Sequence, residues 1–498
     1  MKIITVIIIL LSFVQLHAQE KYPKGEVRGA WIATVKNIDW PFSNEETSGE
    51  QISEMVAIFD SLKAAGINTV YFQVRTECDA LYKSSYEPWS YWLTGKQGRA
   101  PNPYYDPLSF AISAAHKRGM ELQAWFNPYR AVRKIGEYKI SPSHVSVLHP
   151  NWILKFKDSE MLNPGIPAVT KYIAKIVADV VKRYNIDGVH FDDYFYPYVP
   201  HITNQDYKTF LKYKGNFTNI NDWRRNNINQ MVEEVYNTIK SIKPKVKFGI
   251  SPFGIVENKY AGTNGFESYY KIYSDPLTWL KDKTVDYIVP QLYWKIGNKA
   301  ADYSKLLPWW QSVTNGRQLY IGVFSSKFAN PDFKDSKSEI ENEIKLNRKY
   351  KNVYGTVFFS AKSIYKNYSN LADSLKDHYF KYPAIVPTMP WLDNVPPLPP
   401  SDLKETYDSS KGIILSWKGP GIASDGDTAY QYIIYRFSGE SKINLNDPRH
   451  IMDIITNRKT QYEDKNVEKG VNYIYVISAL DRLHNESLNN PRIHVYLQ

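Results

Sequence analysis

Two adjacent carboxylates stand at the end of a short apolar stretch, residues 186–197, which reads IDGVHFDDYFYP. A carboxylate among aromatic side chains is costly unless it is hydrogen-bonded or reaches solvent in a cleft, so Asp192 and Asp193 need such surroundings. Paired carboxyl groups are the usual machinery of glycoside cleavage, where one protonates the leaving oxygen and the other acts as nucleophile or base. The structural alternative is that the two acids order the following loop, because Asp is common in loops.

Period-two alternation along this stretch separates the two acids. His190, Asp192 and Tyr194 share one face of an extended strand, while Val189 and Phe191 share the other face with Asp193. The apolar face is expected to pack against helices, which directs Asp192 toward the interior of a sheet or barrel. Asp193 ranks second, because it can turn inward only if the strand ends before it.

Strand-like apolar runs recur eight times between residues 24 and 382, and helical stretches alternate with them. The expected strands are 27–35, 69–75, 121–126, 188–192, 247–251, 287–293, 319–324 and 355–359, and the expected helices are 51–65, 107–118, 166–184, 220–242, 269–281, 303–313, 336–349 and 371–378. Eight such units predict a (β/α)8 TIM barrel. A doubly wound open sheet is the competing fold, but VRGAWIATVKN lacks the Gly-rich turn that this fold usually carries after its first strand.

The pattern changes after the barrel. Residues 383–400 form a Pro-rich linker, expected to be a stiff spacer, and residues 401–498 carry the short strand-like runs GIILSW, YQYIIY and NYIYVIS. Such runs predict a small all-β immunoglobulin-like sandwich, and ILSW, YIIYR and YIYVISALD resemble the fibronectin type III module. Because a spacer crosses few contacts, removal of residues from Asn394 onward is expected to leave the barrel folded.

Composition narrows the classes of function. Aromatic residues make up 15% of the chain, which favours a protein that stacks sugar rings, although an aromatic core is the alternative. The net charge of +11 comes from scattered Lys and Arg without a basic run, so no nucleic-acid partner is expected. Residues 1–18 read as a signal peptide, too short in its apolar part for a transmembrane segment, which predicts export to the periplasm or the extracellular envelope.

Cys78 is the single cysteine, so neither a disulfide framework nor a Cys/His metal cluster is expected, and the sequence implies no cofactor.

Barrel enzymes carry their chemistry at the carboxyl ends of the strands, and the polar residues found there are the candidate site. The catalytic candidates are Asp192, Asp193 and Asp79, and the substrate-binding candidates are Trp31, Arg75, Glu77, Asn127, Tyr129, Arg130, Tyr196, Gln291, Tyr293 and Trp294. For the partner of Asp192 the order is Asp193, Asp79, Glu77 and then Glu257, each with loop ordering as the alternative. Arg75 is expected to orient a carboxylate through its planar fork. The mixture suits sugar hydroxyls and lacks the ligand set of a metallohydrolase.

Several motifs in order carry a family resemblance: EVRGAWIATV, YFQVRTECDALY, AWFNPYR, DGVHFDDYFYP, ISPFG and PQLYW. Together they resemble the glycosyl-hydrolase-like 10 family, formerly domain of unknown function 187. The resemblance spans the barrel and implies a glycosidase of the bacterial envelope with a polysaccharide or oligosaccharide substrate. At least one relative is linked to cutting peptidoglycan glycan strands stripped of their stem peptides.

The register DG-x-x-x-D also resembles strand four of α-retaining glycosidases and of chitinase-like enzymes, and it places the catalytic aspartate at Asp192. Tyr194 stands where the chitinase pattern has a glutamate, which argues against a substrate-assisted mechanism with its acid at that position. The run GVFSSKF carries no carboxylate, which disfavours a nucleophile on strand seven.

The sequence therefore predicts a secreted glycoside hydrolase that acts on an envelope glycan, of the type of denuded peptidoglycan strands. The sandwich is expected to serve as spacer or as a docking element for the cell envelope. The alternative is a catalytically silent barrel that binds glycan and scaffolds the envelope, since no acid/base pair is complete from sequence alone.

Overall fold

Eight parallel strands close into a barrel, as the sequence predicts. The computed structural model describes residues 22–332, 338–439, 442–456 and 459–497, so the expected signal peptide lies outside the described residues. The barrel strands follow one another in chain order, and the last pairs with the first. They are β1 (Val27–Ile32), β2 (Thr69–Arg75), β3 (Glu121–Phe126), β7 (Gly188–Phe191), β8 (Lys247–Ile250), β9 (Tyr287–Ile288), β10 (Gln318–Val323) and β11 (Val353–Phe358).

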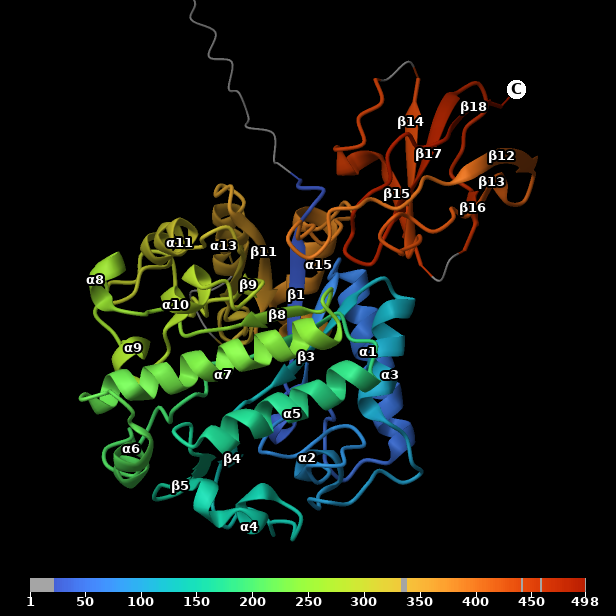
Figure 1. The fold of residues 1–498 in the computed structure, drawn as a ribbon. Coiled ribbons are helices and arrows are strands. Elements are labelled where there is room, and N and C mark those ends of the chain that lie inside the picture. The colour runs from blue at the N-terminus through green and yellow to red at the C-terminus, as the bar shows by residue number, and fades with distance from the viewer. Residues whose placement is uncertain (1–21, 333–337, 440–441, 457–458, 498) are drawn as a thin grey trace, which may run out of the picture.

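Helices surround the barrel, and α5 and α7 cross its front side by side (Figure 1). The main ones are α1 (Ser48–Ala64), α3 (Pro107–Lys117), α5 (Pro167–Arg183), α7 (Ile220–Ile242), α10 (Pro276–Lys281), α11 (Tyr303–Ser312), α13 (Glu339–Asn347), α14 (Ala361–Tyr365) and α15 (Leu371–Ser374). The long loop after β3 adds a small antiparallel sheet of β4 (Arg130–Val132), β5 (Ile153–Lys155) and β6 (Glu160–Leu162). Shorter helices in the loops are α2 (Tyr91–Thr94), α4 (Val145–Leu148), α6 (Tyr207–Tyr213), α8 (Asn258–Ala261), α9 (Ser268–Lys271) and α12 (Ser325–Phe328).

Alternation along β7 separates the core into two parts. Val189 and Phe191 pack outward in the large cluster that joins strands to helices, while His190 faces the barrel interior beside Trp31 and Tyr287. Gly188 has no room for a side chain, because a Cβ there would lie 1.8 Å from Gln123 Oε1. The interior is therefore filled by large polar and aromatic side chains from the neighbouring strands, which approach β7 at its glycine.

Strand β9 is shorter than the sequence pattern suggests. The apolar run 287–293 predicts seven residues, whereas only Tyr287 and Ile288 pair continuously with both neighbours. Pro290 has no N–H to donate to the ladder, so regular pairing stops before it. Gln291 then forms isolated bridges to Phe253 and Gly322, which bring its side chain to the mouth of the barrel.

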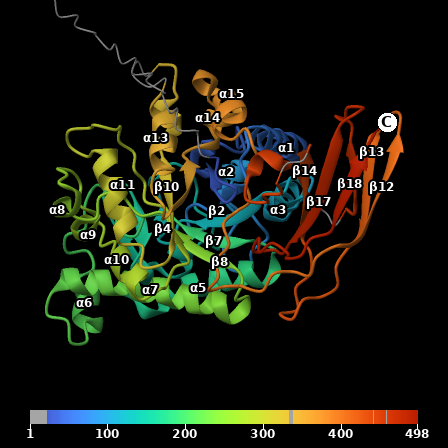
Figure 2. The ribbon, with the colours of Figure 1, turned by 90° about the horizontal axis from the view of Figure 1, so that it is seen from above.

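The C-terminal unit is an all-β sandwich of two antiparallel sheets, as predicted. One sheet has the order β12 (Ser401–Asp408), β13 (Gly412–Lys418), β16 (Gln461–Asp464), and the other has the order β15 (Ile451–Ile455), β14 (Gln431–Ser438), β17 (Asn472–Leu480), β18 (Arg492–Tyr496). Trp417, Tyr432 and Tyr475 lie in the core between them. Figure 2 shows the sandwich beside α1 and α3, on one side of the barrel.

The Pro-rich segment differs from the free spacer that its composition suggests. Val386 and Met389 are buried in the aromatic cluster of the barrel interior, and Trp391 Nε1 donates to Asp286 at 3.0 Å. The segment therefore covers the amino-terminal end of the barrel. Proline fixes the backbone of this segment but does not prevent its side chains from packing, which is why composition alone misjudges it.

The sandwich is also tied to the barrel by ion pairs whose carboxylates are buried. Arg482 donates from Nη2 to Asp187 Oδ1 at 2.9 Å, and His484 Nε2 lies 3.0 Å from Glu121 Oε1, which in turn pairs with Lys247. Removing residues from Asn394 onward would take Arg482 from Asp187 and His484 from Glu121, while His116 and Lys247 would remain as their partners. These ion pairs cross a boundary at which the composition predicts few contacts.

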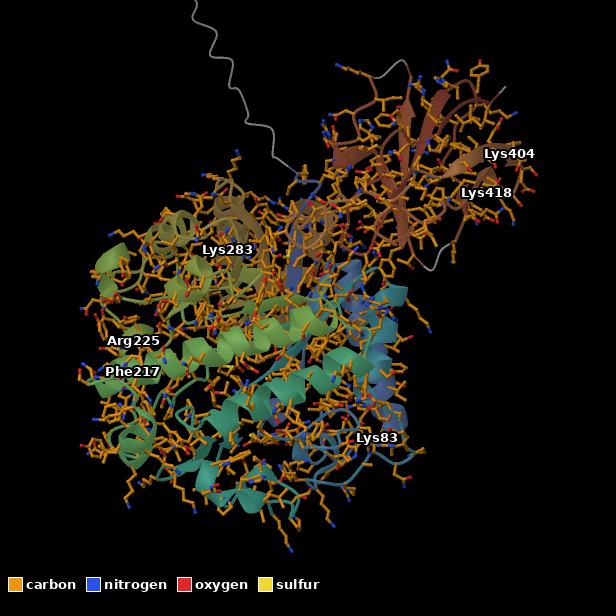
Figure 3. All side chains as sticks on the ribbon, viewed as in Figure 1. Lys83, Phe217, Arg225, Lys283, Lys404 and Lys418 are labelled. Carbon is orange, nitrogen blue, oxygen red and sulfur yellow. The ribbon has the colours of Figure 1, made fainter. Side chains whose placement is uncertain are left out.

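In Figure 3, Lys83 and Lys283 lie far apart on the barrel, whereas Lys404 and Lys418 lie near each other on the paired strands β12 and β13 of the sandwich. No helix within the described part of the chain is long and apolar enough to cross a membrane.

Candidate functional site

A cavity of about 330 Å³ opens at the carboxyl-terminal mouth of the barrel. Both acids of the DD pair line it, together with aromatic and amide side chains from seven of the eight strands or the loops that follow them. Its lining comprises Trp31, Ala33, Val35, Ile38, Gln73, Trp125, Arg130, Asp192, Asp193, Tyr194, Tyr198, Ser251, Phe253, Gln291, Tyr293 and Phe359. An aromatic cavity with a few convergent polar groups is typical of a binding site for a small or chain-like ligand.

Asp192 is fixed on the side of β3. Its Oδ2 accepts hydrogen bonds from Trp125 Nε1 at 3.0 Å and from Asn127 Nδ2 at 3.2 Å, and its Oδ1 accepts from the backbone N–H of Tyr194 at 3.3 Å. The residue is only 4% exposed. Trp125 and Asn127 are two residues apart on one face of β3 and its extension, so a single strand supplies both side-chain donors.

Asp193 turns into the same cavity because β7 ends at Phe191, two residues earlier. Its Oδ2 accepts a short hydrogen bond from the Tyr198 hydroxyl, and Gln291 also hydrogen-bonds to the carboxylate. Gln291 is itself oriented by donating from Nε2 to the carbonyl of Ser251 at 2.9 Å. The two acids therefore lie side by side but are held by different parts of the barrel.

Burial dominates the electrostatics of the pair. It raises the pKa of Asp192 to about 6, against the opposing effects of the Arg130 charge and of the hydrogen bonds from Trp125 and Tyr194. Burial likewise raises the pKa of Asp193 to about 7, with the Tyr198 hydrogen bond lowering it and the charge of Asp192 raising it further. Near neutral pH one of the two can thus carry a proton while the other is ionised, which is the condition for acid and base chemistry at one site.

His190 supports this cavity as a neutral side chain. Burial lowers its pKa to about 3, so the imidazole stays uncharged across the physiological range. Trp31 Nε1 donates to His190 Nε2 at 3.2 Å, and Nδ1 therefore carries the hydrogen that faces the Tyr287 hydroxyl, also at 3.2 Å. The Ser251 hydroxyl lies 3.1 Å from Nε2. His190 thus orients two residues of the cavity wall, Trp31 and Ser251.

A second cavity of about 220 Å³ adjoins the first, and Arg130, Tyr194 and Tyr198 line both. Tyr129 and Tyr196, two of the predicted substrate-binding residues, line the second cavity and are buried, and their hydroxyls have no hydrogen-bond partner in the protein. Arg130 lies over the Tyr194 ring at 4.8 Å. These groups extend the site beyond the carboxylates.

Arg75, Glu77 and Asp79 lie outside the lining of both cavities. Arg75 pairs with Glu87 through Nε at 2.8 Å and Nη2 at 2.6 Å, and Glu77 accepts from Trp92 Nε1 at 2.8 Å and from the backbone of Arg133. Asp79 accepts from the Thr76 hydroxyl at 2.7 Å and the Glu77 N–H at 3.0 Å. The structure gives these three residues loop-ordering contacts.

The remaining predicted residues divide between the cavity and its surroundings. Trp31, Gln291 and Tyr293 line the main cavity, and Asn127 reaches it through Asp192. Trp294 packs edge-on against Phe253, with ring centroids 5.3 Å apart, and does not line the cavity. Glu257 also lies outside it: burial would raise its pKa, but hydrogen bonds from Lys259 and Tyr270 lower it.

The chain is similar to known proteins over most of its length. Residues 26–339 match the family described as Glycosyl hydrolase-like 10. The chain belongs to this family. It is 40% identical over 487 residues to a protein of Bacillus subtilis strain 168 named Glycosyl hydrolase YngK, covering 94% of this chain and 93% of that protein. It is 40% identical over 363 residues to Glycosyl hydrolase DigH of Escherichia coli strain K12, covering 67% of this chain and 82% of that protein.

Among solved structures, the glycoside hydrolase domain of PgaB (BpsB) from Bordetella bronchiseptica aligns with 71% of this chain and 98% of its own, with a TM-score of 0.45 and 10% identity. The family match ends before β11 and the sandwich. The Pro-rich segment that covers the amino-terminal end of this glycosyl-hydrolase-like barrel therefore lies outside the matched residues.

The candidates from the sequence leave out several residues of this site, among them Phe253, Phe359, Trp125, Gln73 and Tyr198. Trp125 precedes Asn127 on the inward face of β3, and alternation through that strand would have found it. Gln73 faces inward from β2; its Oε1 accepts from the backbone of Thr34 and Val35 at 3.0 Å each, and its buried Nε2 has no partner in the protein. Tyr198 comes from the irregular loop after β7, where no periodic signal exists.

The described residues of the main cavity wall include no His or Cys ligand beside the two carboxylates. Within the described chain, the one group of three carboxylates with metal-ligand spacing is Asp393, Asp425 and Asp427, and Lys245 Nζ lies 2.6, 2.6 and 2.8 Å from them. This group therefore ties the barrel to the sandwich through a cation that the protein itself supplies.

Proposed function

We propose that this protein is a glycoside hydrolase whose catalytic acids are Asp192 and Asp193. The observation that carries the proposal is the presence of both carboxylates, buried and with raised pKa values, in one aromatic cavity at the carboxyl-terminal end of a (β/α)8 barrel. Barrel enzymes place their chemistry at this end, and glycosidases use a protonated carboxyl group beside an ionised one. Membership of a glycosyl-hydrolase-like family and relatives named glycosyl hydrolase support it.

The two carboxyl groups take different roles. Asp193 has the higher pKa and serves as the acid that protonates the leaving oxygen, with Tyr198 and Gln291 holding it in place. Asp192, hydrogen-bonded by Trp125 and Asn127 and close to Arg130, is ionised first and stabilises the positive charge that develops on the sugar. Trp31, Tyr293 and Phe359 provide aromatic faces for the sugar rings.

The proposed substrate is a glycan of the bacterial cell envelope, of the type of peptidoglycan strands without stem peptides. We further propose export to the periplasm or the extracellular envelope, based on the signal-like residues 1–18. The sandwich, with its resemblance to fibronectin type III modules, is proposed to bring the barrel to the envelope.

The test measures sugar release from denuded glycan strands by the wild type and by Asp192→Asn and Asp193→Asn. Each substitution preserves shape and removes ionisable chemistry, so activity is expected to fall by about 10²- to 10⁴-fold. Glu257→Gln, outside the cavity and on the same carboxyl-end loops, is the matched control and should keep wild-type activity.

Two outcomes contradict the proposal. Full activity in either aspartate variant would remove that residue from the chemistry. Absence of release by the wild type across a panel of envelope glycans, combined with measurable binding of those glycans, would instead favour the silent glycan-binding barrel.

A further inference from the structure

The two carboxylates of the cavity stand on one wall of it. Asp192 and Asp193 are chain neighbours after β7, and their Cα atoms are only about 3.8 Å apart by backbone geometry. Among the described residues that line the cavity, they are the only carboxylates. Other acids near the strand ends are engaged elsewhere, Glu77 and Asp79 in loop contacts and Asp39 in bonds to Ala33, Ser360 and Lys362.

The opposite wall is apolar. In the closed strand order, β7 lies across the barrel from β11, with β1 next to β11. The strand ends there contribute Phe359, Trp31, Ala33 and Val35 to the cavity lining, and none of these side chains can act as nucleophile or base.

The usual two-carboxylate mechanisms do not fit this arrangement. Retaining glycosidases place an acid and a nucleophile about 5 to 5.5 Å apart across the scissile bond, and inverting ones place an acid and a base about 6.5 to 9.5 Å apart with a water between them. Both schemes need a carboxylate on each side of the reacting carbon. In this cavity both acids come from the β7 side, and the β11 and β1 side offers aromatic and aliphatic carbon.

We infer that the substrate supplies its own nucleophile, the carbonyl oxygen of a 2-acetamido group on the sugar that occupies the cavity, with Asp193 as acid and Asp192 as the group that binds the acetamide N–H. The inference rests on the proposed glycosidase function and assigns the site to glycans built from 2-acetamido-2-deoxy sugars. It differs from the chitinase-like pattern because the acid is Asp193 and not the residue at position 194, which is Tyr194.

The reaction is balanced without any further reagent. The acetamide carbonyl oxygen forms a bond to the anomeric carbon while the bond to the leaving oxygen breaks, and Asp193 transfers its proton to that oxygen. The positive charge of the resulting cyclic oxazolinium is spread over the amide, whose N–H is held by the Asp192 carboxylate. Water then attacks the anomeric carbon and gives a proton back to Asp193, the ring opens, and the configuration is retained.

The contacts of Asp192 suit this role. Trp125 and Asn127 both donate to Oδ2, so that Oδ1, which accepts only the long 3.3 Å bond from the Tyr194 N–H, is available for a further donor. The aliphatic side chains of Ala33 and Val35 offer an apolar surface for the acetamide methyl group. Gln73, which comes from β2 and lines the same cavity, has a buried Nε2 donor without a protein partner that can bind a sugar oxygen.

The experiment compares three preparations of denuded glycan strands: N-acetylated, de-N-acetylated, and de-N-acetylated strands re-acylated with trifluoroacetyl groups. Fluorine withdraws electrons from the carbonyl oxygen with little change in size. We therefore expect kcat to fall about tenfold or more for the trifluoroacetyl strands at similar KM, and no cleavage of the free-amine strands. A thiazoline analogue of the oxazoline should inhibit the wild type and Glu257→Gln equally, and Asp192→Asn at least about tenfold more weakly.

The outcomes separate this inference from the proposed function. Equal kcat for the acetyl and trifluoroacetyl strands, or a covalent sugar trapped on Asp192 or Asp193 by a 2-fluoro glycoside, would overturn the inference and leave the glycosidase intact. Failure to cleave any of the strands would overturn both. Cleavage of acetylated strands with the fluorine effect and thiazoline inhibition would support the inference.

Discussion

The hydrogen bond from Tyr198 to Asp193 makes a sharp prediction about the pH dependence of activity. The Tyr198 hydroxyl donates to the ionised form of Asp193 and thereby lowers the pKa of a carboxyl group that burial has raised to about 7. If Asp193 is the acid, it must be protonated, and activity falls as pH rises through its pKa. Tyr198→Phe removes the donor, raises the pKa, and should move the alkaline limb of the pH profile to higher pH.

The size of the shift follows from the bond that is lost. A hydrogen bond to a charged group contributes about 1.5 to 3 kcal/mol, and one pKa unit corresponds to about 1.4 kcal/mol. Tyr198 is partly exposed, so water replaces some of the loss and the lower end applies. We expect the alkaline limb to move up by about one pH unit. The acidic limb, which depends on ionisation of Asp192, should move less.

The assay is kcat/KM measured from pH 4 to 10 on one glycan, because this ratio reports the ionisations of the free enzyme. Tyr129→Phe is the matched control for limb position, since it removes a buried hydroxyl that has no partner in the neighbouring cavity. An alkaline limb that stays in place in Tyr198→Phe, or moves to lower pH, would refute the assignment of Asp193 as the acid.

Two further perturbations follow from the same structure. Trp125→Phe removes a hydrogen-bond donor to ionised Asp192, so the pKa of Asp192 should rise. The acidic limb of the pH profile of kcat/KM should then move up by as much as about one pH unit. An acidic limb that stays in place would contradict the role of Asp192. Arg482→Met leaves Asp187 without its partner from the sandwich and should lower the free energy of unfolding in urea by about 1 to 3 kcal/mol at pH 7. The change should be smaller for Arg449→Met, which removes an exposed ion pair. Although burial would raise the pKa of Asp187, His116 and Arg482 hold it low, so this stabilisation is present above the unfolded pKa of about 3.9 and the gap between variant and wild type should close as pH falls below it; a constant gap would contradict the ion pair as its source.

Much of the fold follows from local pattern. The count of apolar runs predicts the barrel, and alternation predicts that His190 faces inward while Val189 and Phe191 face the helices, which the structure has. Alternation alone would place Asp193 on the outward face, but it holds only within a strand. Because β7 ends at Phe191, Asp193 is free to turn into the cavity.

Contacts between distant segments could not be read from the sequence. Arg75 was expected to orient a carboxylate, but its partner Glu87 lies in an irregular loop without periodicity. The hydrogen bond between Arg482 and Asp187 joins residues almost three hundred positions apart, and the sequence around neither residue predicts the contact. Composition likewise describes residues 383–400 as a linker and gives no information about what their side chains touch.

The ion pairs between the sandwich and the barrel have a consequence for the order of folding. During synthesis the barrel sequence emerges first, and domains generally fold as they emerge. Arg482 and His484, which contact Asp187 and Glu121, follow the last barrel strand, β11, by more than one hundred residues. The barrel strands are therefore synthesised before the residues of the sandwich that pair with Asp187 and Glu121, and we expect these ion pairs to form after the strands have assembled.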